Sequence, residues 1–320
     1  MRHFLDFIKL AITSVGGSIL ILMLLGVASV PAKAENKLNT IFNDSAANNG
    51  GLSKAGTGEK VYSKDYDHKI EGEYSEKFVL AHGDCGTRGG WNDCNTDRQR
   101  IERKVDYRFG KHVWYKFSFY LDKEWDDDTQ ASIAQVKIKD VRTPVWMLRV
   151  DYGVLKLDMN ILGSYDSSCN FLLGREDMKG KWNHVVIYAN YSKEPTPWLK
   201  NKYMGLWING KQMQIDQCAN WEILGNERSK YSRKGTSFRY GLYSSYVSNE
   251  LNAKAIQAGV DMKLKGWKDK GGRGKAGAVY SMTNKPWKID WPVKLKTKRI
   301  WFDDMDMAKS DKNIWGMEVK

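Results

Sequence analysis

Short runs of aromatic and β-branched residues, each about as long as one strand, recur along the chain from about residue 61 onward. Turn residues separate many of these runs, which is typical of antiparallel strands. Clear examples are residues 113–121, 132–138, 146–150, 154–159, 182–191, 203–208, 237–243 and 299–305. Asn209-Gly210 follows one of them and predicts a hairpin, because both residues tolerate positive φ. Helical periodicity is scarce outside residues 249–258, so we predict an all-β sandwich or jelly roll with few short helices.

The first 34 residues have the pattern of a secretory signal peptide. Arg2 and Lys9 precede the uncharged, largely apolar stretch 10–30, and the small-residue pattern A-x-A follows this stretch at 32–34. We therefore predict cleavage before Glu35 and a secreted or periplasmic protein, with no stable membrane insertion after cleavage. The alternative is an uncleaved anchor, because 21 uncharged residues are long enough to span a bilayer of about 30 Å.

Three segments follow the predicted cleavage site. Residues 35–60 are rich in Asn, Gly, Ser and Ala, and we interpret them as a flexible leader. Residues 61–310 contain the strand-like runs and form the predicted β domain, and residues 311–320 form a C-terminal tail. The chain has 12% aromatic residues, including 13 Trp, which is enough to fill a core and excludes a disordered chain.

Charge adds an expectation about the partner. The 320-residue chain has a formal net charge of +13, and removal of residues 1–34 leaves +11. An exported protein this basic is expected to meet a polyanion, although charge also serves solubility. Residues 263–299 hold 12 bases and 2 acids, and we interpret them as a solvated loop or as a mobile flap over an acidic chain. A nucleic-acid or anionic-surface binder acting through this segment ranks last, and we expect no nucleic-acid partner because the sequence has no recognisable motif for one.

Four cysteines follow the predicted cleavage site: Cys85, Cys94, Cys169 and Cys218. An even number in an exported chain predicts two disulfides, and four cysteines allow three connectivities. We favour Cys85–Cys94, which would close the Gly-rich loop 86–90, together with Cys169–Cys218. Buried free thiols are the weaker alternative. The chain has no C-x-x-C pair, so we do not expect a structural zinc site.

Three strand-like segments separate polar from apolar side chains, because alternate residues of a strand point to opposite sides. The shared polar faces carry Arg98, Arg100, Glu102 and Lys104 in one segment, Gln135 and Lys137 in the second, and Arg239 and Tyr243, with Gly241 between them, in the third. Arg103 falls on the inward side, which the pattern does not explain. If the three faces line one groove, the groove carries Arg100, Glu102, Gln135, Lys137, Arg239 and Tyr243.

This set of groups suits β-elimination at a uronic acid. The C5 proton of a uronate is a very weak acid, so amide and guanidinium donors on the carboxylate must stabilise the enolate-like charge that develops. A phenol can take that proton when nearby cations favour its phenolate, and it can return a proton to the glycosidic oxygen. The scheme requires no cofactor and no metal.

The same segments resemble the heparin-lyase-like polysaccharide lyases, relatives of the alginate and glucuronan lyases, over roughly residues 74–308. The most specific part is HGDC at 82–85, DC at 93–94 and DRQRIE at 97–102, similar to that family's GDC…DC…DRxRSE segment. IAQVK at 133–137 resembles a strand that often reads QxH, and SFRYGLY at 237–243 resembles the lyases' YFKxGxY strand.

The resemblance implies a concanavalin-like jelly roll and roles for individual residues. It implies that Gln135 and Arg100 neutralise the substrate carboxylate and that Tyr243 is the proton donor and a candidate base. Arg239 stands where related lyases keep a substrate-binding lysine. Lys137 stands where many relatives have His, and a lysine is a base only if its pKa falls, which neighbouring guanidiniums favour. Two alternatives are a second carboxylate clamp at Lys137, with Tyr243 performing both proton transfers, and a site that has lost catalysis but kept binding.

Arg98, Glu102 and His82 complete the predicted substrate-binding set, His82 because it adjoins the predicted disulfide loop and could reach the groove edge. Three acids near residue 305 (Asp303, Asp304 and Asp306) carry hard oxygen ligands that Ca²⁺ accepts, but a solvated strand end is the simpler interpretation. We therefore predict no metal site.

These observations together favour an exported, monomeric polysaccharide lyase that cleaves a uronate-containing acidic polysaccharide by β-elimination. The alternative is a non-catalytic jelly-roll protein that binds acidic glycans, since the same fold and the same charge would serve it.

Overall fold

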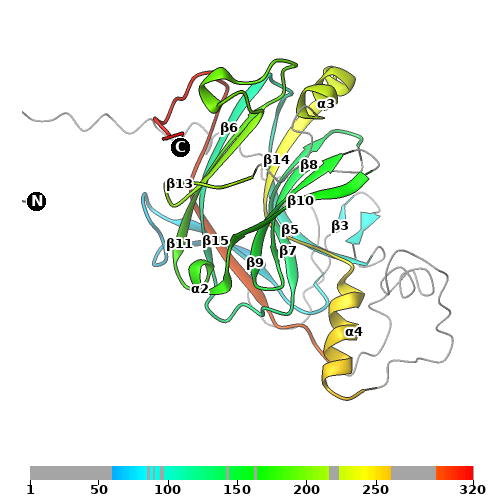
Figure 1. Ribbon diagram of the computed structural model, residues 1–320. Helices are drawn as coiled ribbons and strands as arrows, with labels where there is room; N and C mark the ends of the chain where they lie inside the picture. Colours follow the sequence, from blue (N-terminus) through cyan, green and yellow to red (C-terminus); the bar gives the residue numbers. More distant parts are fainter. Residues whose placement is uncertain are drawn as a thin grey trace, which may run out of the picture. The chain divides into compact units, whose positions relative to one another are not determined.

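Two antiparallel β-sheets, of seven and six strands, make up most of the described chain and lie face to face as two layers (Figure 1). The structure is a computed structural model that describes residues 60–84, 87–88, 91–93, 97–141, 144–161, 164–215, 223–260 and 293–319. The predicted signal peptide, the leader up to residue 59 and residues 261–292 of the basic region lie outside this range. No helix in the described part of the chain combines the length and the apolar character needed to cross a membrane.

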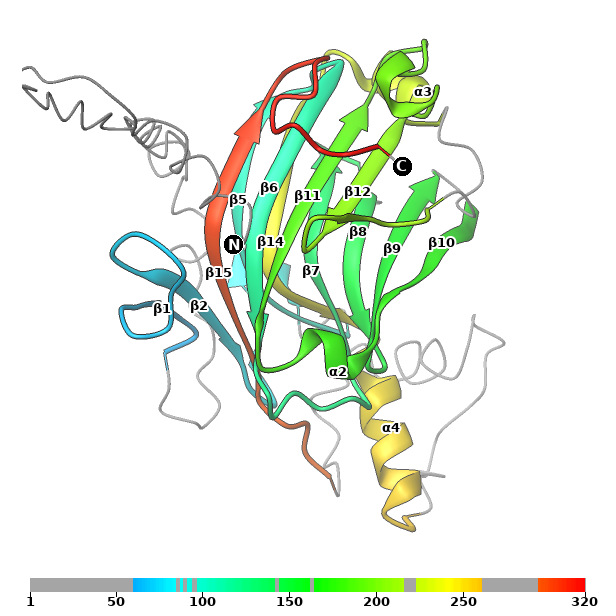
Figure 2. The same ribbon diagram turned by 60° about the vertical axis from the view of Figure 1, so that its left-hand side comes forward.

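The seven-stranded sheet has the strand order β1-β2-β15-β6-β11-β12-β13 (Figure 2). Its strands, in that order, are Tyr62–Asp65, Ser75–Leu80, Lys298–Ala308, His112–Leu121, Trp182–Asn190, Met204–Ile208 and Lys211–Gln212. The turn between the last two strands is Asn209-Gly210, with φ of 52° and 77°. This confirms the predicted hairpin, because both residues take the left-handed conformation that the turn requires.

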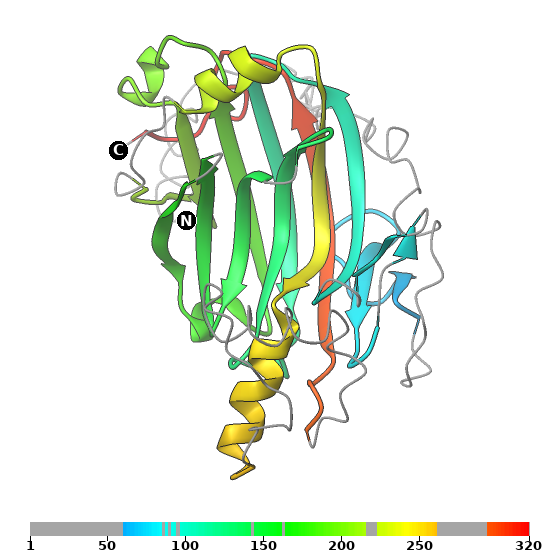
Figure 3. The same cartoon turned by 90° about the vertical axis from the view of Figure 1, so that its right-hand side faces the viewer.

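The six-stranded sheet has the order β10-β9-β8-β7-β14-β5. Its strands, in that order, are Ser164–Leu173, Val154–Ile161, Pro144–Asp151, Gln130–Ile138, Gly235–Ser245 and Arg98–Arg108. A separate two-stranded sheet pairs β3 (Thr87–Arg88) with β4 (Trp91–Asn92). The described helices are short: α2 (Arg175–Met178), η2 (Pro197–Leu199), α3 (Ile223–Tyr231) and α4 (Val247–Gln257), and α4 extends from the end of β14 (Figure 3). The all-β jelly-roll sandwich predicted from the sequence is therefore confirmed.

Aromatic side chains from the inner faces of both sheets form the core. Phe78 of β2 meets Tyr240 of β14 with ring centroids 5.7 Å apart, and Phe117 of β6 meets Phe238 of β14 at 5.9 Å. Both contacts are within the range in which aromatic pairs attract one another beyond simple burial. Because Phe238 and Tyr240 point inward, strand alternation turns Arg239 to the outer face of the six-stranded sheet.

The core also contains Arg103, whose inward position the sequence pattern leaves unexplained. Its guanidinium forms an ion pair with Glu76 of β2 and donates a hydrogen bond of 2.7 Å to the hydroxyl of Tyr62. Tyr240 donates its hydroxyl to the other oxygen of Glu76. The buried arginine is therefore neutralised by a carboxylate from the facing sheet, as a buried charge requires.

Helix α4 is attached to both sheets through buried polar contacts. Asp97, which precedes β5, accepts hydrogen bonds from the backbone N–H and the hydroxyl of Ser248 in the first turn of the helix, at 2.9 and 2.6 Å. Glu250 of the same helix pairs with Lys298 of β15 at 3.0 Å, and both side chains are almost completely buried. These contacts fix the helix next to the strand ends that carry Arg98 and Tyr243.

Candidate functional site

The strand order β7-β14-β5 places the three polar segments side by side. Arg100 of β5 is the register partner of Tyr243, and Gln135 of β7 is the register partner of Arg239. The outward side chains form what we call the three-strand cluster: Arg98, Arg100, Glu102, Gln135, Lys137, Arg239 and Tyr243. Three segments that are far apart in the sequence thus present their polar side chains on one face of the sheet.

Two guanidinium groups contact the phenol of Tyr243. Arg98 donates Nε–H to the Tyr243 hydroxyl oxygen at 2.9 Å. The guanidinium carbon of Arg100 lies 4.8 Å from the centroid of the Tyr243 ring, in the range of a cation–π contact. A guanidinium has no acceptor, so the phenol accepts from Arg98 and keeps its own O–H free to donate elsewhere.

Arg100 is itself held by a carboxylate, Asp93, that is not among the site residues predicted from the sequence. Asp93 accepts two hydrogen bonds from Arg100, from Nη2 at 2.7 Å and from Nε at 3.1 Å. Burial opposes the charge of Arg100, but Glu102 and Asp93 outweigh it and raise the pKa of the guanidinium above its ordinary value. Asp93 lies in the HGDC…DC motif, so its position in that motif was the only signal that could have pointed to it.

Glu102 lies at the centre of the cluster, only 4% exposed. It accepts a hydrogen bond from the side-chain amide of Gln135 through Oε1. Its Oε2 lies 3.6 Å from Nη1 of Arg100 and 3.9 Å from Nη1 of Arg239. The residue paired with Glu102 on β14 is Gly241, where an added Cβ would lie 2.9 Å from the Glu102 Cα and 2.4 Å from the Ile101 carbonyl oxygen. The glycine between Arg239 and Tyr243 is therefore required for the close approach of β14 to β5.

Lys137 lies farther along β7, where its register partner on β14 is Ser237. Burial lowers the pKa of Lys137 to about 8, and the cations of Arg239, Arg100 and Arg98 act in the same direction while Glu102 opposes them. A lysine with this pKa is partly neutral near pH 8, so its amine can accept a proton.

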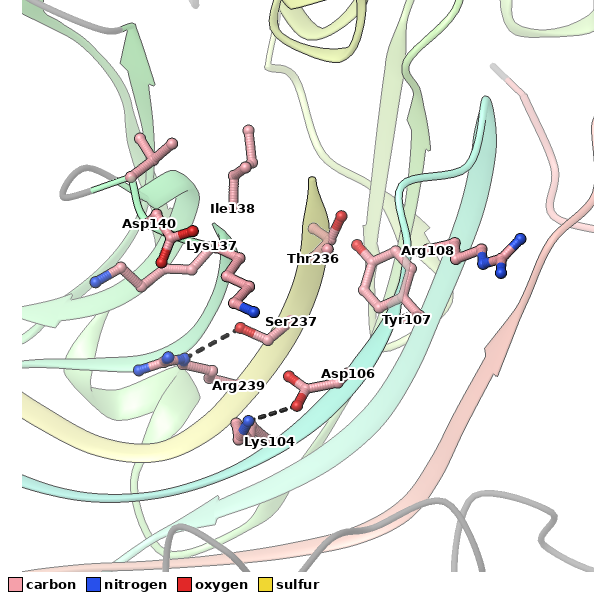
Figure 4. Close-up of a pocket in the computed structure, with 13 residues that line it drawn as sticks. Lys104, Asp106, Tyr107, Arg108, Lys137, Ile138, Asp140, Thr236, Ser237 and Arg239 are labelled. Atoms are coloured by element: carbon pink, nitrogen blue, oxygen red, sulfur yellow. Dashed lines mark hydrogen bonds and ion pairs between the residues drawn. The ribbon is translucent and has the colours of Figure 1, made fainter. Parts of the chain in front are cut away.

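A cavity of about 740 Å³ opens beside Lys137, between the ends of β5, β7 and β14. In Figure 4 the amine of Lys137 and Nε of Arg239 both lie beside the hydroxyl of Ser237. This hydroxyl accepts a hydrogen bond from Nε of Arg239 at 3.2 Å. Arg108 extends away from these three residues (Figure 4). Lys104 and Asp106, which pair with each other, line the opposite wall (Figure 4). The cavity is large enough for a sugar unit and carries more bases than acids.

The remaining predicted site residues lie in other surroundings. His82 accepts a hydrogen bond at Nδ1 from the backbone N–H of Leu295 at 3.2 Å, and burial lowers its pKa. Cys85, Cys94 and Cys218 lie outside the described residues, as does the side chain of Cys169, so the disulfide pairing stays a prediction.

The acids near residue 305 make protein contacts. Asp303 accepts the backbone N–H groups of Ile70 and Glu71, and Asp304 pairs with Lys116 at 2.9 Å. Within the described ranges, no group of three or more His, Cys, Asp or Glu side chains could hold a metal ion.

Comparisons with known proteins gave similar solved structures and one matching family model. The chain resembles the solved structure of an endo-β-1,4-glucuronan lyase from the fungus Trichoderma reesei, with 14% sequence identity and a TM-score of 0.43 over 84% of this chain and 94% of that chain. It resembles a family 7 alginate lyase in complex with substrate, with 11% identity and a TM-score of 0.44 over 81% of this chain and 85% of that chain. It also resembles the cellulose-induced protein Cip1, with 11% identity and a TM-score of 0.41 over 86% of this chain and 96% of that chain. No curated protein matches the sequence. A family model described as polysaccharide lyase matches residues 47–269, which include the whole three-strand cluster. Because this match spans more than half of the chain, the protein belongs to the polysaccharide lyase family.

Proposed function

We propose that the protein is an exported lyase that cleaves a uronate-containing acidic polysaccharide by β-elimination at the three-strand cluster. The observation that carries the proposal is the phenol of Tyr243, held between the guanidiniums of Arg98 and Arg100 on the same face as the amide of Gln135. Elimination needs a proton acceptor, a proton donor and a cationic or amide clamp for the carboxylate, and this face supplies all three kinds of group.

In this mechanism the uronate carboxylate binds to Arg100 and to the free N–H of Gln135. Both groups donate hydrogen bonds, and they stabilise the charge that moves onto the carboxylate when the C5 proton leaves. Gln135 is 1% exposed and Arg100 is held by Asp93, so both donors are preorganised. Arg239 adds a further positive charge beside the same position.

Lys137 accepts the C5 proton, and Tyr243 donates its proton to the glycosidic oxygen. The electron pair of the C5–H bond forms the C4=C5 double bond, and the C4–O bond breaks with its electrons going to the leaving oxygen. The proton held by Lys137 then returns to the phenolate of Tyr243 through solvent, which completes the cycle. The alternative is that Tyr243 performs both transfers and Lys137 is a second carboxylate clamp.

The substrate class follows from charge. The mature chain, with a net charge of +11, would attract a polyanion. The cavity that Lys137 lines would accept part of an acidic sugar chain. Heparin-type, alginate, glucuronan and pectic chains all offer uronates, and the resemblance to heparin-lyase-like enzymes puts heparin-type chains in the test set.

The experiment is a product assay with purified protein on alginate, glucuronan, heparin-type and pectic substrates. A C4=C5 double bond conjugated to the carboxylate absorbs in the ultraviolet, so elimination raises the absorbance whereas hydrolysis does not. We expect at least one substrate to give this signal together with new reducing ends. Binding to an acidic glycan without product on any substrate would instead indicate the non-catalytic alternative.

A further inference from the structure

We propose that Glu102 is a positioning residue: it orients the amide of Gln135 and the guanidiniums of Arg100 and Arg239, and it does not contact the glycan. This inference rests on the proposed function of the cluster. It differs from the substrate-binding role that the sequence analysis expects for Glu102.

The contacts and the charge of Glu102 support this role, whereas burial alone would not, because Gln135 is buried to a similar degree. The Glu102 side chain is 4% exposed, and both of its oxygens face protein groups on three adjacent strands. Its Oε2 has no hydrogen-bond partner among the described residues, although two guanidiniums lie within 4 Å of it. A carboxylate in this position would also repel a uronate, so direct contact with the substrate is unfavourable.

The direction of the hydrogen bond fixes the amide of Gln135. An ionised carboxylate only accepts hydrogen bonds, so Gln135 must present Nε2 to Glu102 and not its carbonyl oxygen. One N–H of the amide is then used by Glu102, and the second stays available for a substrate carboxylate. Without the carboxylate the amide could turn over and offer an oxygen to the anion, which would be repulsive.

Glu102 also balances the charge around Lys137. Charged groups from two neighbouring strands face or line the space near Lys137: Arg98, Arg100, Glu102, Lys104, Asp106 and Arg108 on β5, and Arg239 on β14. Lys139 and Asp140 follow Lys137 in the chain and line the same space. On β8 the register partner of Lys137 is the uncharged Pro144. Asp106 and Asp140 are themselves paired with Lys104 and Lys234. Glu102 is therefore the acid whose charge opposes the effect of the guanidiniums on Lys137.

The test replaces Glu102 by its neutral isostere in Glu102→Gln. Removing the negative charge should lower the pKa of Lys137, so the pH at which Lys137 loses its proton should move down. The Lys137 titration is followed by NMR of isotopically labelled lysine, with the signal assigned through Lys137→Gln, and kcat/KM is measured against pH in parallel. We expect kcat to fall about tenfold to a hundredfold, as misplaced groups typically cause.

Two further variants separate positioning from general stability. Glu102→Asp keeps the charge but shortens the side chain, so it should keep the Lys137 titration near that of the wild type and still lower kcat. Glu76→Gln removes another partly buried carboxylate that pairs with an arginine of β5, Arg103, but on the inner side of the sheet. It should lower the free energy of unfolding without moving the Lys137 titration.

The outcomes distinguish this inference from the proposed function. A lower pKa of Lys137 in Glu102→Gln, with an unchanged pKa in Glu76→Gln, supports the charge-balancing part of the role even if none of the tested glycans is cleaved. A lower kcat in Glu102→Asp, with an unchanged pKa of Lys137, supports the positioning part. If the pKa of Lys137 is unchanged in Glu102→Gln, or falls by the same amount in Glu76→Gln, the inference is overturned even if the wild type is an active lyase.

Discussion

At the scale of single residues, the chemistry depends on which group donates each hydrogen bond. Arg98 donates to the oxygen of Tyr243, so the phenol proton is left for an acceptor on the ligand. Asp93 and Glu102 hold Arg100, and Glu102 also holds Gln135. Two buried carboxylates thus support the set of donors to which the proposed mechanism assigns the anionic ligand, which is how a site can be rigid and still cationic.

The pH dependence of turnover tests the role of Lys137. Burial lowers the pKa of Lys137 to about 8, and only the neutral amine can accept the C5 proton. We therefore expect kcat/KM to rise as the pH increases through about 8 and to level off above it. Lys137→Gln should reduce turnover by about two orders of magnitude or more and should remove this limb of the profile.

The matched control for this experiment is Lys156→Gln. Lys156 is a lysine of β9 that pairs with Asp151 at 2.8 Å, outside the three-strand cluster. The Lys156→Gln variant should leave both the rate of turnover and its pH profile unchanged. A Lys137→Gln enzyme with the turnover and pH profile of the wild type would assign the base to another group, with Tyr243 the first candidate.

At the scale of strands and helices, alternation alone was enough to predict which side chains share a face. Phe238, Tyr240 and Leu242 are buried as expected, and Arg239 and Tyr243 face outward. The register irregularity between Ser132 and Ala134 on β7 was not predictable, because a bulge depends on the partner strand β8. Ser132 and Gln135 are the register partners of Tyr243 and Arg239, so the irregularity places both on the outer face of the sheet.

Asp97 permits a prediction about helix α4. Burial raises the pKa of Asp97 to about 6, although the hydrogen bonds from Ser248 act in the other direction. The folded protein therefore binds this proton more tightly than the unfolded chain, in which the pKa is about 4. The contribution of Asp97 to stability is fully present below about pH 4 and is lost as the pH rises through about 6.

The measurement is urea unfolding of the wild type and of Asp97→Asn at several pH values between about 4 and about 7. The free energy of unfolding of the wild type, relative to that of the variant, should decrease over this interval. Asp177→Asn changes a carboxylate of α2 that is 73% exposed, and it should show no such trend. If the difference in the free energy of unfolding between the wild type and Asp97→Asn does not vary with pH, the raised pKa does not belong to Asp97.

At the scale of the whole molecule, the order of the strands was the part that the sequence could not provide. The pairing of β5 with β14 and of β15 with both β2 and β6 joins segments more than 100 residues apart, and no local pattern encodes such a partner. Arg103 illustrates the consequence, because its partner Glu76 lies on the facing sheet. The contact between Asp93 and Arg100 was missed for a related reason, since it depends on how the chain around β4 folds back on β5.

The proposed mechanism requires β5, β7 and β14 to bring their polar side chains to one sugar unit, and Tyr243→Phe tests this requirement. The variant removes one oxygen, the acceptor of the Arg98 hydrogen bond, and keeps the ring under Arg100. The rate of unsaturated product formation is measured beside Tyr152→Phe, which changes a 51% exposed tyrosine of the β8–β9 turn, with glycan affinity measured in parallel. We expect Tyr243→Phe to lose about a hundredfold or more in rate while it retains glycan binding, and Tyr152→Phe to behave like the wild type. Equal rates for Tyr243→Phe and the wild type would exclude Tyr243 as the proton donor and with it the proposed site.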